Sequence, residues 1–170
     1  MIELLFTTSD YKFSRLARWA LNSDCSHFAI LMDRKIVFHS NFTGVHIEPI
    51  QSFLKMNHII HRLQLNTLPT LQQEDELWLR LIDINYGKSY DVGAMLFLGF
   101  NLIAHKLVNW PISKNNLWQT KEAFICTEIL ESLSGLKLGS ATFPDMGRVD
   151  MRKPHDLYLE IKSFPFIIAS

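Results

Sequence analysis

Two short apolar segments on either side of a polar turn constrain the fold of this chain most strongly. Residues 25–31 end in the run Phe28-Ala29-Ile30-Leu31, and residues 35–40 read Lys-Ile-Val-Phe-His-Ser. A short continuous apolar run is typical of a strand that is buried on both faces of a sheet. Met32-Asp33-Arg34 is a turn candidate between the two segments. The pattern therefore predicts a β-hairpin within a buried sheet.

Each predicted strand of this hairpin carries a histidine, and the register decides whether the two rings meet. If His27 lies directly opposite His39, the loop is Met32-Asp33-Arg34. Three residues is a common length for a hairpin loop. A two-residue loop would place the two rings on opposite faces of the sheet. We predict the three-residue loop, which lets His39 hold the ring of His27 in a fixed orientation.

Hydrophobic periodicity predicts an ordered series of further strands and helices. Other predicted strands span residues 2–7, 44–48, 59–65 and 164–168. Predicted helices span residues 12–22, 71–84, 91–105 and 124–133, with shorter helical turns after Pro49 and at 154–157. Residues 86–89 and 111–118 read as irregular, and Gly135 suits the residue that follows a helix. The series predicts one α+β domain over residues 1–170, with an antiparallel sheet packed against helices.

Composition excludes several classes of protein. Lys+Arg and Asp+Glu both number 17, so the formal charge is zero, which argues against a nucleic-acid binder held by phosphate contacts. The two cysteines are too few for a disulfide scaffold. Met1 to Phe6 lacks the basic region of a signal peptide. We therefore expect a cytoplasmic protein with free thiols.

The longest apolar stretch runs from Val92 to Trp110. Asn101, His105, Lys106 and Asn109 interrupt it, so it falls short of the roughly 20 apolar residues that a membrane span needs. We expect a buried helix here, and contact with a membrane surface is the less favoured reading.

Cys126 has two readings. In the first, a helix begins near Cys126, because Phe124-Ile125 are β-formers and Thr127-Glu128 suit a first turn. A helix N-terminus stabilises a thiolate, so Cys126 would then be reactive. In the second, the helix begins at Thr120 and Cys126 lies inert in its middle. The sequence leaves both open.

The order of these motifs resembles the circularly permuted papain-like superfamily. This group includes YiiX-type relatives of the NlpC cell-wall peptidases and the lecithin:retinol acyltransferase-like proteins. The resemblance rests on Ser26-His27-Phe28-Ala29-Ile30, on His39 in the next strand, and on the late Cys126-Thr127-Glu128-Ile129. Tyr90-Asp91 is similar to a Tyr-Asp pair that precedes the nucleophile in the YiiX-type branch. Ala29 departs from the glycine that is usual there.

The resemblance implies a permuted papain-like fold and a thiol mechanism. Cys126 would be the nucleophile, His27 its general base and His39 the third, orienting residue; Tyr90 would add a donor on the substrate side. The thiolate would attack an amide or ester carbonyl and form a thioester. A peptide, a peptidoglycan stem or a lipid could supply that carbonyl. No cofactor and no metal are expected.

Alternative readings centre on Cys25. It lies two residues before His27, so we expect both side chains on one strand face. A zinc site of Cys25, His27, His39 and Cys126 is then chemically possible, which would make the chain a non-catalytic binding or structural module. Cys25 could also be a rival nucleophile, or form a disulfide with Cys126. The five other histidines read as surface or structural residues; they are His46, His58, His61, His105 and His155.

Overall fold

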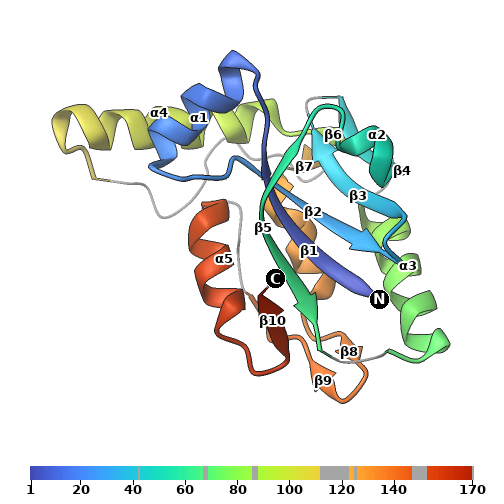
Figure 1. Ribbon diagram of the computed structural model, residues 1–170. Helices are drawn as coiled ribbons and strands as arrows, with labels where there is room; N and C mark the ends of the chain where they lie inside the picture. The colour runs from blue at the N-terminus through green and yellow to red at the C-terminus, as the bar shows by residue number, and fades with distance from the viewer. Residues whose placement is uncertain are drawn as a thin grey trace.

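A six-stranded antiparallel sheet forms the centre of the molecule, in the order β10-β5-β1-β2-β3-β4 (Figure 1). The computed structural model describes residues 1–41, 43–66, 69–85, 88–111, 123–124, 126–146 and 153–169. The strands of this sheet are β1 (Ile2–Thr8), β2 (His27–Met32), β3 (Ile36–Asn41), β4 (Gly44–Pro49), β5 (His58–Leu65) and β10 (Ile167–Ala169). The α+β class and the antiparallel sheet are confirmed.

The helices follow the predicted order with changes at their ends. They are α1 (Lys12–Leu21), α2 (Ile50–Phe53), α3 (Leu71–Asn85), α4 (Val92–Val108), the 3₁₀ helix η1 (Cys126–Leu133) and α5 (Pro154–Lys162). Two pairs of short strands add small ladders: β6 (Ser89–Tyr90) with β7 (Ala123–Phe124), and β8 (Lys137–Leu138) with β9 (Ala141–Thr142). Most of the segment predicted as irregular at 111–118 lies outside the described residues.

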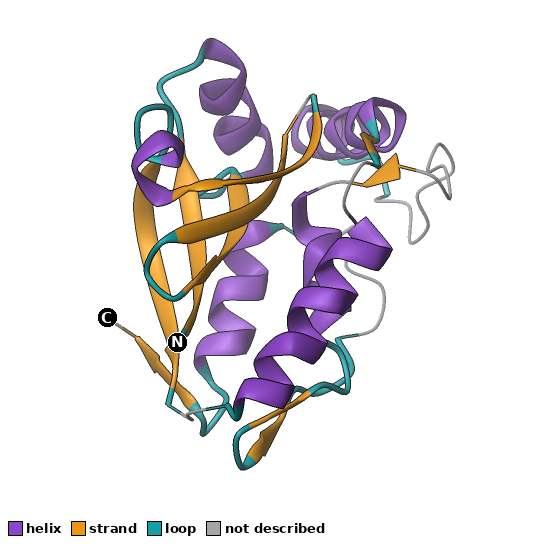
Figure 2. Ribbon diagram, turned by 90° about the vertical axis from the view of Figure 1, so that its right-hand side faces the viewer, coloured by secondary structure: helices purple, strands orange, loops and turns teal. Residues whose placement is uncertain are grey.

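Two separate apolar clusters cover the two faces of the sheet. The core face carries Phe6, Phe28 and Phe38, and side chains of α3, η1 and α5 pack on it. The long helices gather on this side of the sheet in Figure 2. The opposite face, here called the cavity face, carries Leu5, Ala29, Leu31 and Val37, and Phe53 of α2 packs on it. Because neighbouring residues of a strand point to opposite faces, His27 belongs to the cavity face.

The β2–β3 hairpin keeps the predicted loop length but not the predicted register. His39 pairs with Ala29, not with His27, and Met32 pairs with Ile36. The loop is therefore Asp33-Arg34-Lys35. Its first two residues have positive φ angles of 52° and 58°, and the amide of Lys35 donates to the carbonyl of Met32 at 3.0 Å. The shift is two residues, so both histidines still point to the same face.

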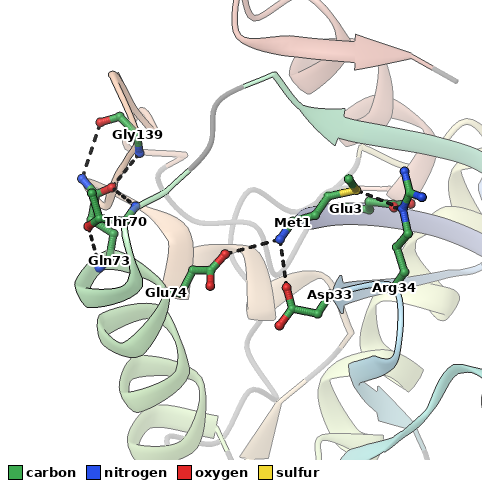
Figure 3. A network of polar contacts seen from close by, with 8 residues as sticks. All are labelled: Met1, Glu3, Asp33, Arg34, Thr70, Gln73, Glu74 and Gly139. Atoms are coloured by element: carbon green, nitrogen blue, oxygen red, sulfur yellow. Dashed lines mark hydrogen bonds and ion pairs between the residues drawn. The ribbon is translucent and has the colours of Figure 1, made fainter.

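The N-terminus of α3 is fixed by reciprocal hydrogen bonds (Figure 3). The amide of Gln73 donates to Thr70 Oγ1 at 3.3 Å, and Gln73 Oε1 accepts the amide of Thr70 at 2.9 Å. This pattern is a capping box, which satisfies two backbone donors. Gln73 Oε1 also accepts the amide of Gly139 at 2.9 Å, so α3 is tied to the β8–β9 turn.

Helix α4 differs from the buried helix that we expected. Asn101 and Leu102 are buried, but Leu96 is 52% exposed and Phe100 is 68% exposed. The apolar run is hydrophobic around much of the helix, and α1 is among the elements that contact it. Within the described ranges, none of the helices has the length and apolar character needed to cross a bilayer.

Candidate functional site

A chain of three side chains lies on the cavity face. His27 Nε2 lies 3.2 Å from His39 Nδ1, and His39 Nε2 lies 2.8 Å from Glu48 Oε1. The side chain of His39 is 3% exposed, while that of Glu48 is 31% exposed. The predicted contact between the two histidines is therefore confirmed, in a diagonal arrangement that the shifted register produces.

The hydrogen bonds assign the tautomers of both rings. The carboxylate of Glu48 is an acceptor, so His39 Nε2 carries a proton and donates it. His39 Nδ1 is then an acceptor, and His27 Nε2–H donates to it. His27 is left with an unprotonated Nδ1, which is the nitrogen that can accept a proton. The hydrogen bonds from His27 through His39 to Glu48 thus hold His27 in one tautomer and orientation, as a carboxylate does for a catalytic histidine.

Burial makes both rings neutral at rest. It lowers the pKa of His27 to about 3, and the neighbouring His39 adds to the lowering. Burial also lowers the pKa of His39, against the opposing effect of Glu48, and His46 lowers it further. Phe53 supplies much of this apolar surrounding: its ring centroid is 6.2 Å from that of His27 and 5.0 Å from that of His39.

A cavity of about 720 Å³ opens beside this chain, and His27, His39 and Glu48 all line it. Residues of α1 and of the segment after α2 form its other walls. Two lining hydroxyl groups lie close together: Ser14 Oγ lies 2.7 Å from Ser26 Oγ, and it also accepts the amide of Ser9 at 3.1 Å. The volume is within the range of small-molecule sites, and most of the lining residues have polar side chains.

Cys126 is the first residue of η1, as the first of the two readings predicted. The alternative helix start at Thr120 is wrong, because Ala123–Phe124 form strand β7. Cys126 is 7% exposed. It does not line the cavity, however, and Ile129, Leu130 and Leu133 of its helix pack on the core face. His39 is a hydrogen-bond partner of His27, and a contact between His27 and Cys126 stays a prediction.

Cys25 does not share the face of His27, which corrects the prediction. It is fully buried in the core-face cluster with Phe6 and Phe28. Strand alternation does not apply to it, because β2 begins only at His27. Burial raises the pKa of Cys25 to about 12, although its hydrogen bond with Ser23 opposes this. A raised pKa argues against Cys25 as a rival nucleophile at neutral pH.

The zinc site considered from the sequence is also wrong. Within the described part of the chain, no three of Cys25, His27, His39 and Cys126 bring ligand atoms close enough to share an ion. The two histidines belong to the cavity face and Cys25 to the core face, so the sheet separates them. Both cysteines are free, so the disulfide alternative is wrong as well.

The structure places the backbone of Tyr90 near the predicted nucleophile. Tyr90 ends strand β6 and pairs with Phe124 of β7, two residues before Cys126. Its side chain lies outside the described part of the molecule, so its role as a donor stays a prediction. Asp91, which follows it, is buried.

Glu48 is the site residue that the sequence reasoning missed. It lies in the strand predicted at 44–48, and β4 pairs His39 with His46 and Val37 with Glu48. A residue two positions from the partner of His39 shares its face, so a carboxylate at this spacing was the available signal. Finding it required the register of a second hairpin, between β3 and β4.

A comparison with models of known protein families finds no match to this chain, and no curated protein matches it either.

Proposed function

We propose that the protein is a hydrolase or acyltransferase that acts on an amide or ester carbonyl, with His27 as general base. The observation that carries this proposal is the chain from His27 through His39 to Glu48 on the wall of a cavity. A hydrogen-bonded series of this kind holds the first histidine in one tautomer and leaves its other ring nitrogen unprotonated, so that this nitrogen can accept a proton from a reacting group. His39 and Glu48 are positioning residues in this scheme.

The neutral resting state of His27 suits this role. A general base must be unprotonated before it reacts, and the lowered pKa keeps Nδ1 free at physiological pH. A low pKa also makes an isolated imidazole a weak base. The Glu48 carboxylate offsets this, because it favours positive charge on the histidine pair when a proton arrives.

The proposal keeps Cys126 as the nucleophile. Its support is the sequence motif, its position as the first residue of η1, and the packing of η1 against β2 and β3, the strands that carry the two histidines. His27 would take the thiol proton, and the sulfur would attack the carbonyl carbon. The leaving group departs with that proton, a thioester forms, and water or another acceptor resolves it. The permuted papain-like fold is part of the same proposal.

A panel of amide and ester substrates tests the proposal with four proteins. These are the wild type, His27→Ala, Cys126→Ala and, as a matched thiol control, Cys25→Ala. We expect His27→Ala and Cys126→Ala to lose activity by about 10²-fold or more. Cys25→Ala should keep activity after allowance for any loss of folded protein.

Two outcomes would contradict separate parts of the proposal. Full activity in Cys126→Ala with loss in His27→Ala would remove the thiol and leave His27 acting on water. Equal activity in His27→Ala and the wild type would overturn the general base. Alkylation of Cys126 with iodoacetamide gives a second readout: its rate should fall when His27 is replaced by alanine.

A further inference from the structure

A second cluster of titratable side chains lies away from the cavity. His61 Nε2 is 2.6 Å from Asp24 Oδ2, and His155 Nδ1 is 2.9 Å from Asp24 Oδ1. One ligand atom from each of the three residues lies within 4.8 Å of the other two. The sequence analysis assigned His61 and His155 to surface or structural roles, since nothing near them in the sequence suggests a partner.

Three distant parts of the chain supply this cluster. Asp24 precedes β2, His61 lies in β5, and His155 is the second residue of α5. Asp24 and His155 are 131 positions apart in the sequence. The fold therefore builds the cluster, and local chain geometry does not.

The rings of this cluster are held in place by aromatic packing. The ring of His61 stacks on that of Tyr158, with centroids 3.9 Å apart and planes 9° apart. Tyr158 is itself buried and belongs to the core face. The side chains of His61, His155 and Asp24 are 22%, 33% and 43% exposed, so an ion can reach them from solvent.

We propose that Asp24, His61 and His155 bind one divalent transition-metal ion of the zinc class. Imidazole nitrogens and a carboxylate oxygen are the donors that zinc takes from proteins, at bonds of about 2.0–2.2 Å. Ligand atoms around tetrahedral zinc lie roughly 3.3 Å apart, so small movements convert the present contacts into coordination. Three protein ligands leave a fourth position for water.

The charge of the cluster also favours a cation. An aspartate side chain is ionised at neutral pH, so Asp24 offers a metal ion a negative charge. Without metal, one carboxylate must serve as acceptor for both rings.

Bound metal would fasten α5 to β5 and to the segment that leads into β2. Asp24 lies three residues before His27, so the ion would hold the segment that leads to His27 in place without contacting the cavity. The inference is independent of the proposed function, because none of the three ligands lines the cavity.

Cobalt titration of the full chain tests this site. After dialysis against chelator, Co²⁺ should bind in one equivalent and give the visible absorption bands of a four-coordinate nitrogen–oxygen site. His61→Ala and His155→Ala should each weaken binding by at least 10-fold. His58→Ala is the matched control, since His58 begins the same strand, pairs with Asp10 and should leave binding unchanged.

Asp24→Asn guards against a folding artefact. It keeps the size of the side chain and one oxygen acceptor but removes the charge, so circular dichroism should match the wild type while Co²⁺ affinity falls. The proposal is overturned if Co²⁺ does not bind, or if His61→Ala and His155→Ala bind it as the wild type does. Either result would leave these contacts as ion pairs alone.

Discussion

Two clusters on opposite faces of one sheet use the same side-chain types in different ways. On the cavity face, His27, His39 and Glu48 form a line in which each ring donates a hydrogen bond to the next group. On the core face, Asp24 alone accepts from both His61 and His155. His61 belongs to that face because it pairs with Phe6 and stacks on Tyr158.

The two clusters differ in the position of the carboxylate relative to the two imidazole rings. At the end of a line, a carboxylate fixes the tautomers and leaves one ring nitrogen free for a proton. Between two rings, it brings two ring nitrogens and a carboxylate oxygen toward one point, where a metal ion could replace the ring protons that now point at the carboxylate. The proposed proton-transfer site and the proposed metal site therefore have similar residue compositions and differ in how their side chains are connected.

The largest expected effect comes from Phe53→Ala on the cavity face. Phe53 is fully buried and packs against both rings of the line. Removing it should lower the free energy of unfolding by about 3–5 kcal/mol, through lost burial and the void left behind. Urea denaturation measures this. Leu159→Ala, at a residue 53% exposed on α5, is the control and should change it by less than about 0.5 kcal/mol.

The same variant sharpens the comparison between the faces. Phe53→Ala should alter substrate turnover but not Co²⁺ binding, provided that both are measured where the protein stays folded. A loss of unfolding free energy below about 1 kcal/mol would mean that Phe53 does not hold the two rings.

Glu48→Gln should have the next largest effect. The substituted amide would keep a similar shape but remove the charge that fixes the His39 tautomer and favours a proton on the histidine pair. We expect kcat on the active substrate to fall about 10²-fold with KM nearly unchanged. Glu48→Asp should recover part of the loss. Glu76→Gln, in an exposed pair with Arg80, is the control and should leave kcat as it was.

The β2–β3 hairpin was predicted from the sequence in most respects, but its register was not. The apolar run at Phe28 and the turn residues predicted the two strands, the loop length and the shared face of His27 and His39. The register could not be predicted, because Asp33 and Arg34 both adopt positive φ angles and pairing resumes only at Ile36. Arginine rarely takes that conformation, so nothing in the composition of the loop indicated it.

The face of the sheet that the helix of Cys126 covers could not be predicted from the sequence, for another reason. Amphipathic spacing correctly indicated that Ile129, Leu130 and Leu133 would be buried. It does not say which face of a sheet such a helix covers, because both faces offer apolar surface. The motif order predicts a meeting of Cys126 and His27, and this meeting stays a prediction.

Acid should destabilise the two clusters in different pH windows. The pKa of His27 is lowered to about 3 from an ordinary value near 6.5, so the unfolded chain binds this proton first. The contribution of neutral His27 to the free energy of unfolding is complete above pH 6.5 and is lost as the pH falls toward 3. The pKa of Asp24 is lowered from 3.8, so the contribution of its carboxylate to the free energy of unfolding is lost only below pH 3.8.

Unfolding free energies measured between pH 7 and 3 check this difference. The wild type should lose stability relative to His27→Gln by about 1–2 kcal/mol over that range, a figure reduced because the His27 ring is partly exposed. Asp24→Asn should follow the wild type down to about pH 4. Parallel curves for His27→Gln and the wild type would contradict a lowered pKa of His27.

The smallest expected change concerns Cys25, the thiol beside Asp24. With its pKa raised to about 12, roughly 3 molecules in 10⁵ carry the thiolate at pH 7.5. Iodoacetamide should therefore leave Cys25 unmodified in the native protein and modify it quickly in urea, as peptide mass spectrometry would report. Because burial is the main cause, Asp24→Asn should raise the native rate only slightly. Modification of native Cys25 at the rate of a free thiol would show that the core face opens there, and would make Asp24 an unsuitable anchor for a metal.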